Sequence, residues 1–539
     1  MRYQYGMVSA PQRAAVEAGL ESLKAGGNVV DAAICAALVQ TVVDPMACGI
    51  AGFGSMHLYL ADQGVHKVLD FHGRAPASVT PQMWEDLVLR ECDDGFGFVL
   101  KGEVNEIGYQ SATTPMTLRA MEDALALYGT KSLSEVLAPA VAQADQGFLV
   151  TPSIHAFWNR PAAYGRIARL RGITDNPEAA RIYSNGHGAS HKVGDIVRNP
   201  DMARTLRRIQ NHGVADFYCG DIASEIVADM DANGGLLTAQ DLAGATTELN
   251  DPLRTQYRGY EIASNPPPGG GLMLLQMLNI LAHFDLSSMG HNSPDYVATV
   301  SEAMKIATID KDTRTGDPAF ADVPVADILS PDYAAHCAAR IKAGEKADVA
   351  RVNPGGLPST DTTHICVADP AGNCVSLTHS LGSSSGVVTP GLGFMYSNGM
   401  AVFDPRPGRI GSLAPGKARV TAMSPTIGFH GGKPSFLVGA PGGTTITMGN
   451  LQAILNIVDF GMSAQEAVDA PRFITTSNTI EICDRIFVAT ERRLKERGYA
   501  VKRHPQSYLP PRVHVVRFTA SGLSDGGADP GGGGVALGI

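Results

Sequence analysis

The spacing of apolar residues predicts that the chain begins with two helices. Apolar residues recur at helical spacing within residues 12–24, and the Gly-Gly-Asn stretch at 26–28 ends that helix in a left-handed cap. A second helix begins at Val29 and ends before Pro45, because the residue before proline disfavours helical geometry. This second segment is apolar almost all the way round, which predicts that it is buried.

Longer helical and irregular stretches follow. Residues 115–235 have a mostly helical pattern, with Gly or Asn-Gly stops closing most of its segments. The NPPPGGG run predicts a rigid turn before a helix from Leu272 to Leu281. Residues 340–361 become rich in Pro and Gly and predict an exposed loop. The glycine-rich C-terminal tail leaves room for one short final strand.

The last third of the chain contains a predicted hairpin. HICVAD and NCVSLTHS are strand-like, and a three-residue Pro-Ala-Gly loop joins them, which is a common hairpin connection. If Asp369 faces Asn373, the register places Thr362 opposite Ser380. A slip of one residue would break this pairing.

A later strand at 434–440 runs into Pro441 and two glycines, Gly442 and Gly443. Thr444 or Thr445 is predicted to cap the helix that follows. Two successive glycines leave backbone N–H groups unblocked, so this turn can stabilise an oxyanion or cradle a phosphate. It can equally serve only to reverse the chain.

Composition and charge narrow the class of protein. The 539 residues are 44% hydrophobic and 18% charged, which is typical of a globular protein. The net charge of −10 and the lack of long basic runs argue against a nucleic-acid partner. The N-terminus lacks a signal-peptide pattern, and the most apolar early segment, 29–43, is too short to span a bilayer. We therefore expect a cytoplasmic enzyme without a membrane partner.

The cysteines and histidines show no metal-ligand spacing. The eight cysteines are scattered without a CxxC pair, which predicts free thiols instead of a disulfide framework. The 15 histidines form no HExxH or comparable pattern. We therefore expect neither a metal nor another cofactor.

Thr362 is the first candidate for chemistry. A threonine hydroxyl is a weak nucleophile and needs a base. If Thr362 were a chain terminus, its own α-amino group, with a pKa near ~8, could be that base. Ser380, opposite on the hairpin, could orient the Thr362 hydroxyl. The alternative is that Thr362, Thr363 and Ser380 are ordinary strand residues.

A second serine motif competes with this interpretation. The segment from Gly382 to Gly386 matches the GxSxG elbow of α/β-hydrolases, with Ser384 as nucleophile. Downstream histidines are available at three positions, His430, His504 and His514. The sequence after this motif does not predict the helix that the elbow requires.

Several motifs in a fixed order resemble the γ-glutamyltransferase family of N-terminal nucleophile (Ntn) hydrolases, and they span nearly the whole chain. They are LKAGGNVVDAAICAALVQTVVDPMACGIAGFG, DTTHICVADPAGNCVSLTHSLGSSSG, TAMSPTI, LVGAPGGTTI, QAILNIVDFGMSAQEAVDAPRF and GGADPGGGG. The resemblance implies an α+β fold, a four-layer αββα sandwich. It also implies self-cleavage between Asp361 and Thr362. The products would be a large subunit, 1–361, and a small subunit, 362–539, which stay associated in one intertwined domain.

The resemblance also assigns site residues. It implies that Thr362 is the nucleophile, Ser380 the orienting hydroxyl, and Gly442 and Gly443 the oxyanion donors. Thr363 and His364 lie in the same motif with supporting roles.

Five departures from the family pattern concern the substrate. FHGRAP places His72 at the apparent position of the arginine that binds the glutamyl α-carboxylate, with Arg74 two residues on. The family's asparagine after the nucleophile strand is Gly382 here, and the acidic residue that holds the α-amino group is Val402. One of the paired serines is Ala422, beside Thr421. The loop at 403–417 is short and lacks a lid.

These departures predict a different acyl group. Val402 cannot pair with an ammonium, so we expect an acyl group without the α-amino group. A terminal carboxylate would be held by Arg74, with His72, Thr421 and Gly382 nearby and Lys417 or Arg419 as helpers. This pattern resembles the branch of the family that contains glutaryl-cephalosporin acylases and oxamate amidohydrolase, which implies an oxamate-like or glutaryl-like small-molecule amide.

Two other functions stay open at this point. One is true γ-glutamyl transfer or glutathione hydrolysis, and the other is a non-catalytic binding protein on the same fold. A dimer of the processed pair of subunits is also an open alternative.

Overall fold

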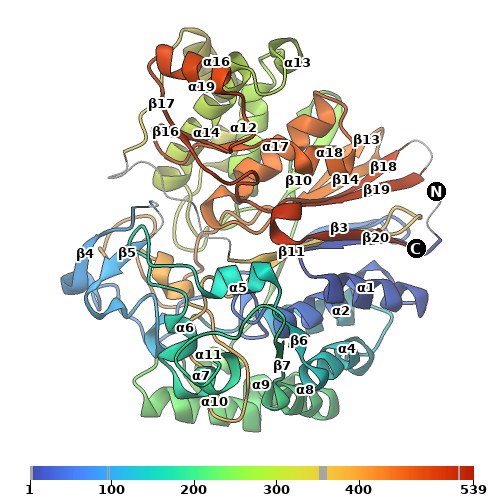
Figure 1. Ribbon diagram of the computed structural model, residues 1–539, viewed down its shortest axis with the longest axis vertical. Coiled ribbons are helices and arrows are strands. Elements are labelled where there is room, and N and C mark those ends of the chain that lie inside the picture. The colour runs from blue at the N-terminus through green and yellow to red at the C-terminus, as the bar shows by residue number, and fades with distance from the viewer. Residues whose placement is uncertain (1–3, 94, 96, 351–360, 520–521) are drawn as a thin grey trace.

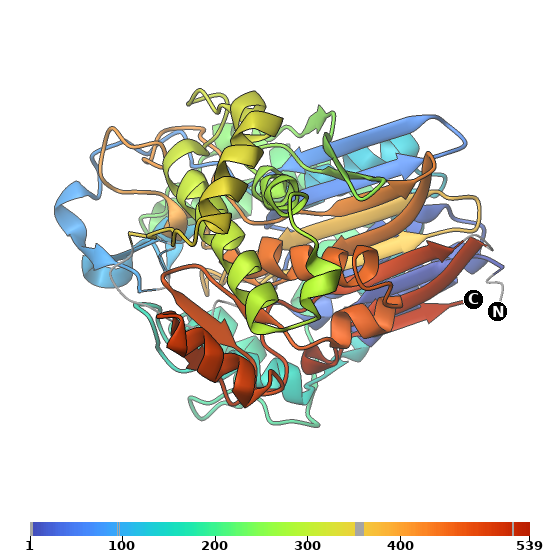
Figure 2. The same ribbon diagram turned by 90° about the horizontal axis from the view of Figure 1, so that it is seen from above.

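Two β-sheets lie face to face in the middle of the molecule, and helices cover the outer side of each (Figure 1). The computed structural model describes residues 4–93, 95, 97–350, 361–519 and 522–539. The order helix, sheet, sheet, helix is the predicted four-layer αββα sandwich of an α+β fold. Figure 2 shows the strands of the two sheets stacked, with helices crossing above them.

The sheets contain seven and six strands. The first has the order β20 (Val535–Gly538), β1 (Met7–Ala10), β11 (Thr363–Ala368), β12 (Cys374–Ser380), β2 (Phe53–Leu60), β3 (Val65–Phe71) and β8 (Glu248–Asn250). The second has the order β19 (Gly522–Ala528), β18 (His514–Thr519), β14 (Lys433–Gly439), β13 (Thr426–His430), β10 (Tyr260–Ser264) and β9 (Leu253–Tyr257). Strand β20 is the predicted final strand.

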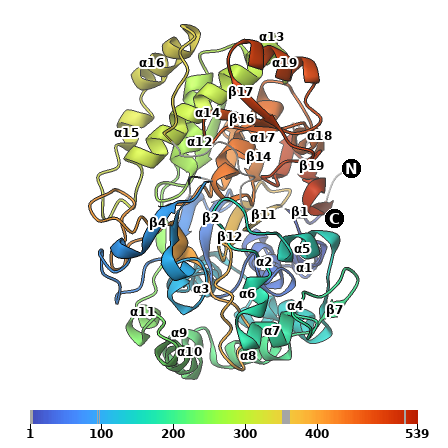
Figure 3. The same cartoon turned by 60° about the vertical axis from the view of Figure 1, so that its left-hand side comes forward.

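One helical layer covers the first sheet and the other covers the second (Figure 3). The first layer and its outer shell comprise α1 (Arg13–Lys24), α2 (Val29–Val43), α3 (Thr117–Tyr128), α4 (Leu133–Gln146), α8 (Pro200–His212) and α10 (Asp221–Ala232). The second comprises α12 (Gly271–Leu281), α14 (Pro294–Arg314), α16 (Pro331–Lys342), α17 (Ile446–Val458), α18 (Ala464–Asp469) and α19 (Val488–Glu496). The predicted helices within 12–24, 29–44, 115–235 and 272–281 are confirmed.

Short elements complete the described chain. The short helices are α5 (Pro152–Trp158), α6 (Arg171–Thr174), α7 (Pro177–Tyr183), α9 (Ala215–Cys219), α11 (Ala239–Ala243), α13 (Leu286–Met289) and α15 (Val325–Ile328). The short strands are β4 (Val88–Glu91), β5 (Phe98–Leu100), β6 (Phe148–Leu149), β7 (Ile196–Val197), β15 (Phe473–Ile474), β16 (Thr479–Ile482) and β17 (Ala500–Arg503). No described helix has the length and apolarity that crossing a membrane requires.

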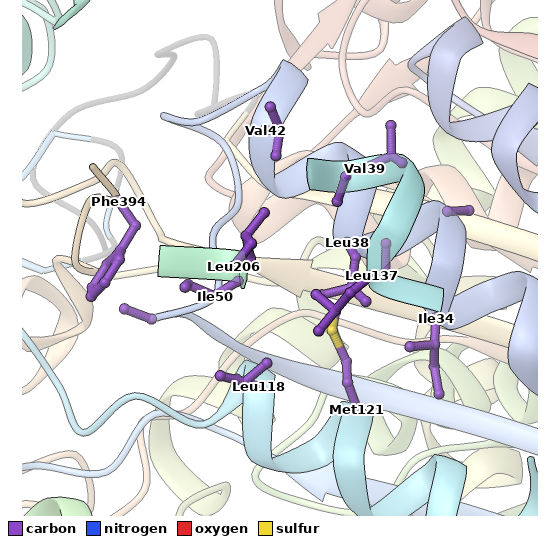
Figure 4. Packing of buried hydrophobic residues seen from close by; sticks show 14 of the residues in the cluster. Ile34, Leu38, Val39, Val42, Ile50, Leu118, Met121, Leu137, Leu206 and Phe394 are labelled. Carbon is purple, nitrogen blue, oxygen red and sulfur yellow. The ribbon is translucent and has the colours of Figure 1, made fainter. Parts of the chain in front are cut away.

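Helix α2 forms the centre of the core under the first sheet. All of its residues are buried, as its continuous apolar pattern predicts. Its side chains pack against α3, α4 and α8 (Figure 4). The Asn28 side chain and Asp31 form a capping box at its N-terminus, which fixes where the helix begins. Both ends of α2 are therefore defined locally, and its C-terminal end lies beside the hairpin of β11 and β12.

The hairpin has the predicted register. His364 faces Thr378, Cys366 faces Ser376 and Ala368 faces Cys374. Because β11 pairs with β1 and β12 pairs with β2, strands from after residue 361 lie between strands from before it. A cut before Thr362 would therefore leave two chains joined by continuous sheet hydrogen bonds.

Two local predictions differ from the structure. Asp361, placed at the end of an exposed loop by the sequence, is buried, and residues 351–360 of that predicted loop lie outside the described part. Thr445 precedes α17, but its hydroxyl donates to the Gly442 carbonyl at 2.9 Å and does not cap the helix. The reason is that a short 3-10 turn, η5 (Gly443–Thr445), separates the glycines from α17.

The eight cysteines all lie within the described residues. They are free thiols, and seven of them are buried. This confirms the predicted absence of a disulfide framework.

Candidate active site

Thr362 lies at the start of β11, and its hydroxyl faces that of Ser380 at the end of β12. The two oxygens are 2.9 Å apart. The Gly382 N–H donates to Ser380 Oγ at 2.8 Å. Either hydroxyl can donate in this contact, because Gly382 occupies only one of the two lone pairs of Ser380 Oγ. In both cases the hydrogen bond fixes the orientation of the Thr362 hydroxyl.

The backbone of Thr362 has a φ of 106°, a region that β-branched residues rarely adopt. Conformations of this kind cost about 1–3 kcal/mol and persist only where surrounding contacts enforce them. The contacts here belong to the preceding residue. The Asp361 carboxylate accepts from Arg169 Nη2 at 2.7 Å and from Ser383 Oγ at 2.5 Å, and Arg160 Nη1 lies 3.9 Å away. The Asp361–Thr362 peptide is thus held in a strained conformation.

Gly442 and Gly443 follow β14 and have φ values of 153° and 55°. A Cβ atom on Gly442 would lie 2.4 Å from Pro511 Cβ, so this position excludes any side chain. Within the described chain, neither glycine N–H donates a hydrogen bond. Gly443 lines the pocket that contains Thr362. Two unengaged N–H groups beside a nucleophile have the composition of an oxyanion hole.

A small cavity of about 60 Å³ opens on one side of Thr362. Its wall includes Ser380, Gly382, Val402, Thr421 and Ala422, which sequence reasoning had singled out from three separate segments. The charged residues of the wall are Asp361, Arg166 and Arg419. The fold therefore gathers most of the predicted substrate positions around the predicted nucleophile.

Arg419 is the most unusual charged group of this cavity. The side chain is 6% exposed, and its Nε and Nη1 atoms have no hydrogen-bond partner in the described structure. Its guanidinium carbon lies 4.4 Å from the centre of the Phe53 ring. Burial first, and then the neighbouring Arg166, lower the pKa of Arg419 to about 9. Both effects arise because the positive charge is poorly solvated.

Arg166 is the second cation of the cavity, and no pattern in the sequence pointed to it. Its Nη1 lies 2.8 Å from Glu106 Oε2. Arg166 comes from an irregular segment between α5 and α6, more than two hundred residues before Arg419. Only the tertiary fold could reveal that Arg166 and Arg419 line the same cavity.

Arg74, the predicted carboxylate ligand, is engaged elsewhere. Its Nη2 is 2.5 Å from Glu248, and its Nη1 is 4.0 Å from Asp317. It is not among the residues that line the cavity. Lys417, one predicted helper, donates to the carbonyl groups of Ile410 and Ser412 at 2.8 and 2.9 Å. In the structure, carboxylates and carbonyls thus already hold both of these cations.

His72 reaches the cavity only through Thr421. Its Nδ1 lies 2.9 Å from Asp70, and its Nε2 lies 2.7 Å from Thr421 Oγ1. Burial alone would raise the pKa of Asp70, but the His72 ring and its hydrogen bonds bring this pKa below its usual value. The chain from Asp70 to Thr421 fixes the orientation of one wall of the cavity.

Thr363 and His364 point away from the cavity to opposite faces of the sheet. Thr363 Oγ1 accepts from Gln40 Nε2 at 2.8 Å, beneath the sheet. His364 lies between the sheets, with Nδ1 2.8 Å from Thr378 Oγ1. Burial, followed by the nearby His514, lowers the pKa of His364 well below its usual value, so it stays neutral. Both residues therefore support β11 from behind Thr362.

The competing serine elbow lacks the required context. Ser384 follows β12, but the described residues 387–398 contain no helix. Its hydroxyl contacts Met395 Sδ at 3.1 Å. Ser383, not Ser384, lines the cavity. The α/β-hydrolase interpretation is wrong for this reason.

A second, much larger cavity of about 1240 Å³ also borders Thr362. Apolar residues of α5 and its flanks, including Phe148, Ile154 and Phe157, line it together with Arg160 and Asp44. The sequence did not predict this groove. Thr362 thus lies where a small cavity meets a much larger groove.

Two facing sheets between helical layers, with a buried threonine at the start of a central strand, define an Ntn hydrolase. The family model described as gamma-glutamyltranspeptidase matches residues 15–539. The chain therefore belongs to the gamma-glutamyltranspeptidase family, and it is an Ntn-type amide hydrolase or acyltransferase. Among the described residues, no group of three or more His, Cys, Asp or Glu side chains could hold a metal ion.

The particular relatives include acylases and glutathione hydrolases. The chain is 38% identical over 529 residues to the acylase ACY 1 proenzyme of Pseudomonas sp. (strain SE83), covering 97% of this chain and 91% of that protein. It is 33% identical over 489 residues to the glutathione hydrolase proenzyme of Escherichia coli (strain K12), covering 88% and 81%. The crystal structure of cephalosporin acylase from Bacillus halodurans has a TM-score of 0.86 and 29% identity, covering 100% of this chain and 96% of that one.

Proposed function

We propose that the chain cleaves itself before Thr362 and then hydrolyses small acyl amides, with Thr362 as the nucleophile. In the first step Thr362 Oγ1 attacks the Asp361 carbonyl carbon, and the peptide nitrogen becomes a free α-amine as the bond breaks. Water then hydrolyses the ester, which leaves Asp361 at the end of residues 1–361. Release of the strained φ at Thr362 supports this step. The pieces 1–361 and 362–539 would stay associated through the shared first sheet.

The same groups serve turnover. The new α-amine takes the Thr362 proton, and the oxygen attacks the substrate carbonyl. Ser380 holds the hydroxyl in place, and the N–H groups of Gly442 and Gly443 stabilise the oxyanion. The amine product leaves, and water releases the acyl group.

The acyl group we propose is anionic and lacks an α-amino group. Val402 in the cavity wall carries this proposal, because it stands where an acidic residue would be needed to hold an ammonium. The one carboxylate in the described wall, Asp361, is already bound to Arg169 and Ser383. Two arginines favour an anion instead. Oxamate-like and glutaryl-like amides meet these requirements, and we propose hydrolysis over acyl transfer.

The competing function is hydrolysis or transfer of γ-glutamyl groups, which the similarity to glutathione hydrolases favours. Paired turnover of glutaryl-p-nitroanilide and γ-glutamyl-p-nitroanilide by the self-cleaved protein separates the two. These substrates differ only in the α-amino group. Faster glutaryl turnover supports our proposal, and faster γ-glutamyl turnover contradicts it. Intact mass before and after incubation tests self-cleavage independently.

A further inference from the structure

Arg419 stands out in a search of the whole described molecule for polar groups that lack partners beside a cavity. Few of the described residues with such atoms also line a cavity that a ligand can enter. Arg419 combines an exposed fraction of 6% with two unpartnered nitrogens and a position in the wall beside Thr362. A buried guanidinium without an acceptor is costly, and an anionic ligand would remove that cost.

The position of Arg419 explains why it, and not Arg74, faces the cavity. The Arg419 backbone N–H donates to the Gly73 carbonyl at 3.0 Å, so the segment around Arg419 runs directly beside that of His72 and Arg74. The His72 side chain forms a hydrogen bond with Thr421, and the Arg74 side chain forms an ion pair with Glu248. The neighbouring segment therefore supplies the cation to the cavity.

Gly382 makes room for this arginine. A Cβ atom on Gly382 would begin 3.3 Å from Arg419 Nη1 and 2.4 Å from Asn398 Oδ1, and the backbone has a φ of 69°. A side chain here would crowd the guanidinium and strain the backbone. The glycine at 382 and the arginine at 419 are thus linked features of the same wall.

The geometry points to Arg419 as the residue that binds the carboxylate of the substrate's acyl group, in the space that Gly382 leaves open. This inference rests on the proposed acylase function and deepens it. A planar guanidinium binds a carboxylate through two parallel hydrogen bonds, which fixes the far end of a short chain as well as neutralising its charge. With the carboxylate at Arg419 and the carbonyl at Thr362, the acyl chain spans the small cavity. Arg166 adds a second positive charge beside it.

The test compares glutaryl-p-nitroanilide with valeryl-p-nitroanilide, in which a methyl group replaces the carboxylate. For Arg419→Met we expect the glutaryl-to-valeryl ratio of kcat/KM to fall roughly 100-fold or more, since the charged contact and its fork geometry are lost. Arg74→Met is the matched control, and its ratio should stay within about threefold of the wild type because Arg74 binds Glu248. Self-cleavage, followed by intact mass, reports whether each variant folds.

If Arg419→Met does not self-cleave, Arg419→Lys replaces it. Lysine keeps the positive charge but lacks the paired N–H donors of the guanidinium, so the glutaryl-to-valeryl ratio of kcat/KM should fall roughly tenfold. Inhibition by free glutarate should weaken in parallel. A ratio that is unaffected in the Arg419 variants, or that collapses only in Arg74→Met, overturns the inference while the acylase function stands. A wild-type enzyme that prefers γ-glutamyl-p-nitroanilide would instead overturn the proposed function itself.

Discussion

The two cavities that meet at Thr362 differ in size and in the state of their charged groups. The small cavity of about 60 Å³ has an arginine without a partner, Arg419, among its walls. The larger cavity, of about 1240 Å³, has apolar walls together with several arginines and a carboxylate, Asp44, that accepts from Gln12 at 2.6 Å. A small cavity whose wall holds an unmet charge discriminates sharply between ligands, whereas a much larger cavity tolerates variation. We therefore expect selectivity for the acyl half of the substrate and tolerance for the amine half.

Thr362→Ala is expected to have the largest effect, because Thr362 belongs to both cavities. Self-cleavage and turnover should both fall below detection, since no other group can form the ester. Intact mass and p-nitroaniline release measure the two. Thr362→Ser is the matched control and should retain measurable cleavage. A cut and active Thr362→Ala protein would refute the nucleophile assignment.

Gly442→Ala should reduce kcat by roughly 100-fold or more through damage to the oxyanion donors. The added Cβ would meet Pro511 at 2.4 Å, and the φ of 153° suits only glycine, so the turn must shift. Gly461→Ala is the control, because Gly461 also has a positive φ but no atom near its Cβ position. An equal loss in both variants would mean that general destabilisation, measured by Tm, explains the effect.

A substrate series compares the two cavities directly. The small cavity holds roughly four to six water-sized groups, which suits an acyl chain no longer than glutaryl. Extending glutaryl to adipyl by one methylene should lower kcat/KM by about 10–200-fold. Enlarging the amine from aniline to naphthylamine should change kcat/KM by less than about fivefold. The reverse order of sensitivities would exchange the roles of the two cavities.

Asp44→Asn should have the smallest effect, on the pH dependence of stability. Burial first, opposed by the Gln12 hydrogen bond, and then the Asp361 charge raise the pKa of Asp44 to about 7. Because the folded pKa exceeds the unfolded value of about 4, the folded state holds the proton more tightly, and stability falls as pH rises from 4 to 7. The loss amounts to at most about 4 kcal/mol by this linkage.

Denaturant unfolding of the uncut Thr362→Ala protein measures this dependence. The same protein with Asp44→Asn keeps an acceptor for Gln12 and should show a flatter profile between pH 4 and 7. Identical profiles with and without Asp44 would show that this carboxyl does not titrate there. Any dependence of stability on pH that remains in both proteins belongs to other titrating groups.

Local sequence patterns were sufficient to predict the two elements that hold the proposed catalytic groups, the hairpin and the glycine turn after β14. The Pro-Ala-Gly turn and the alternation of its flanking strands fix the hairpin register, and the register alone brings Thr362 to Ser380. The two glycines after β14 can be found in the same way, since their backbone conformations exclude other residues. Turns and strand periodicity depend on neighbours in sequence, so the sequence contains what is needed to predict them.

The surroundings of these elements were decided by the tertiary structure. The exposed or buried state of Asp361, the pairing of Arg74 with Glu248, and the position of Arg166 all depend on contacts between residues far apart in the chain. The sequence contains several cations that could bind the carboxylate of the proposed substrate, and no local pattern distinguished between them. In the structure Arg74 and Lys417 already have acceptors, whereas two nitrogens of Arg419 have none among the described residues, because packing determines which neighbours reach each cation.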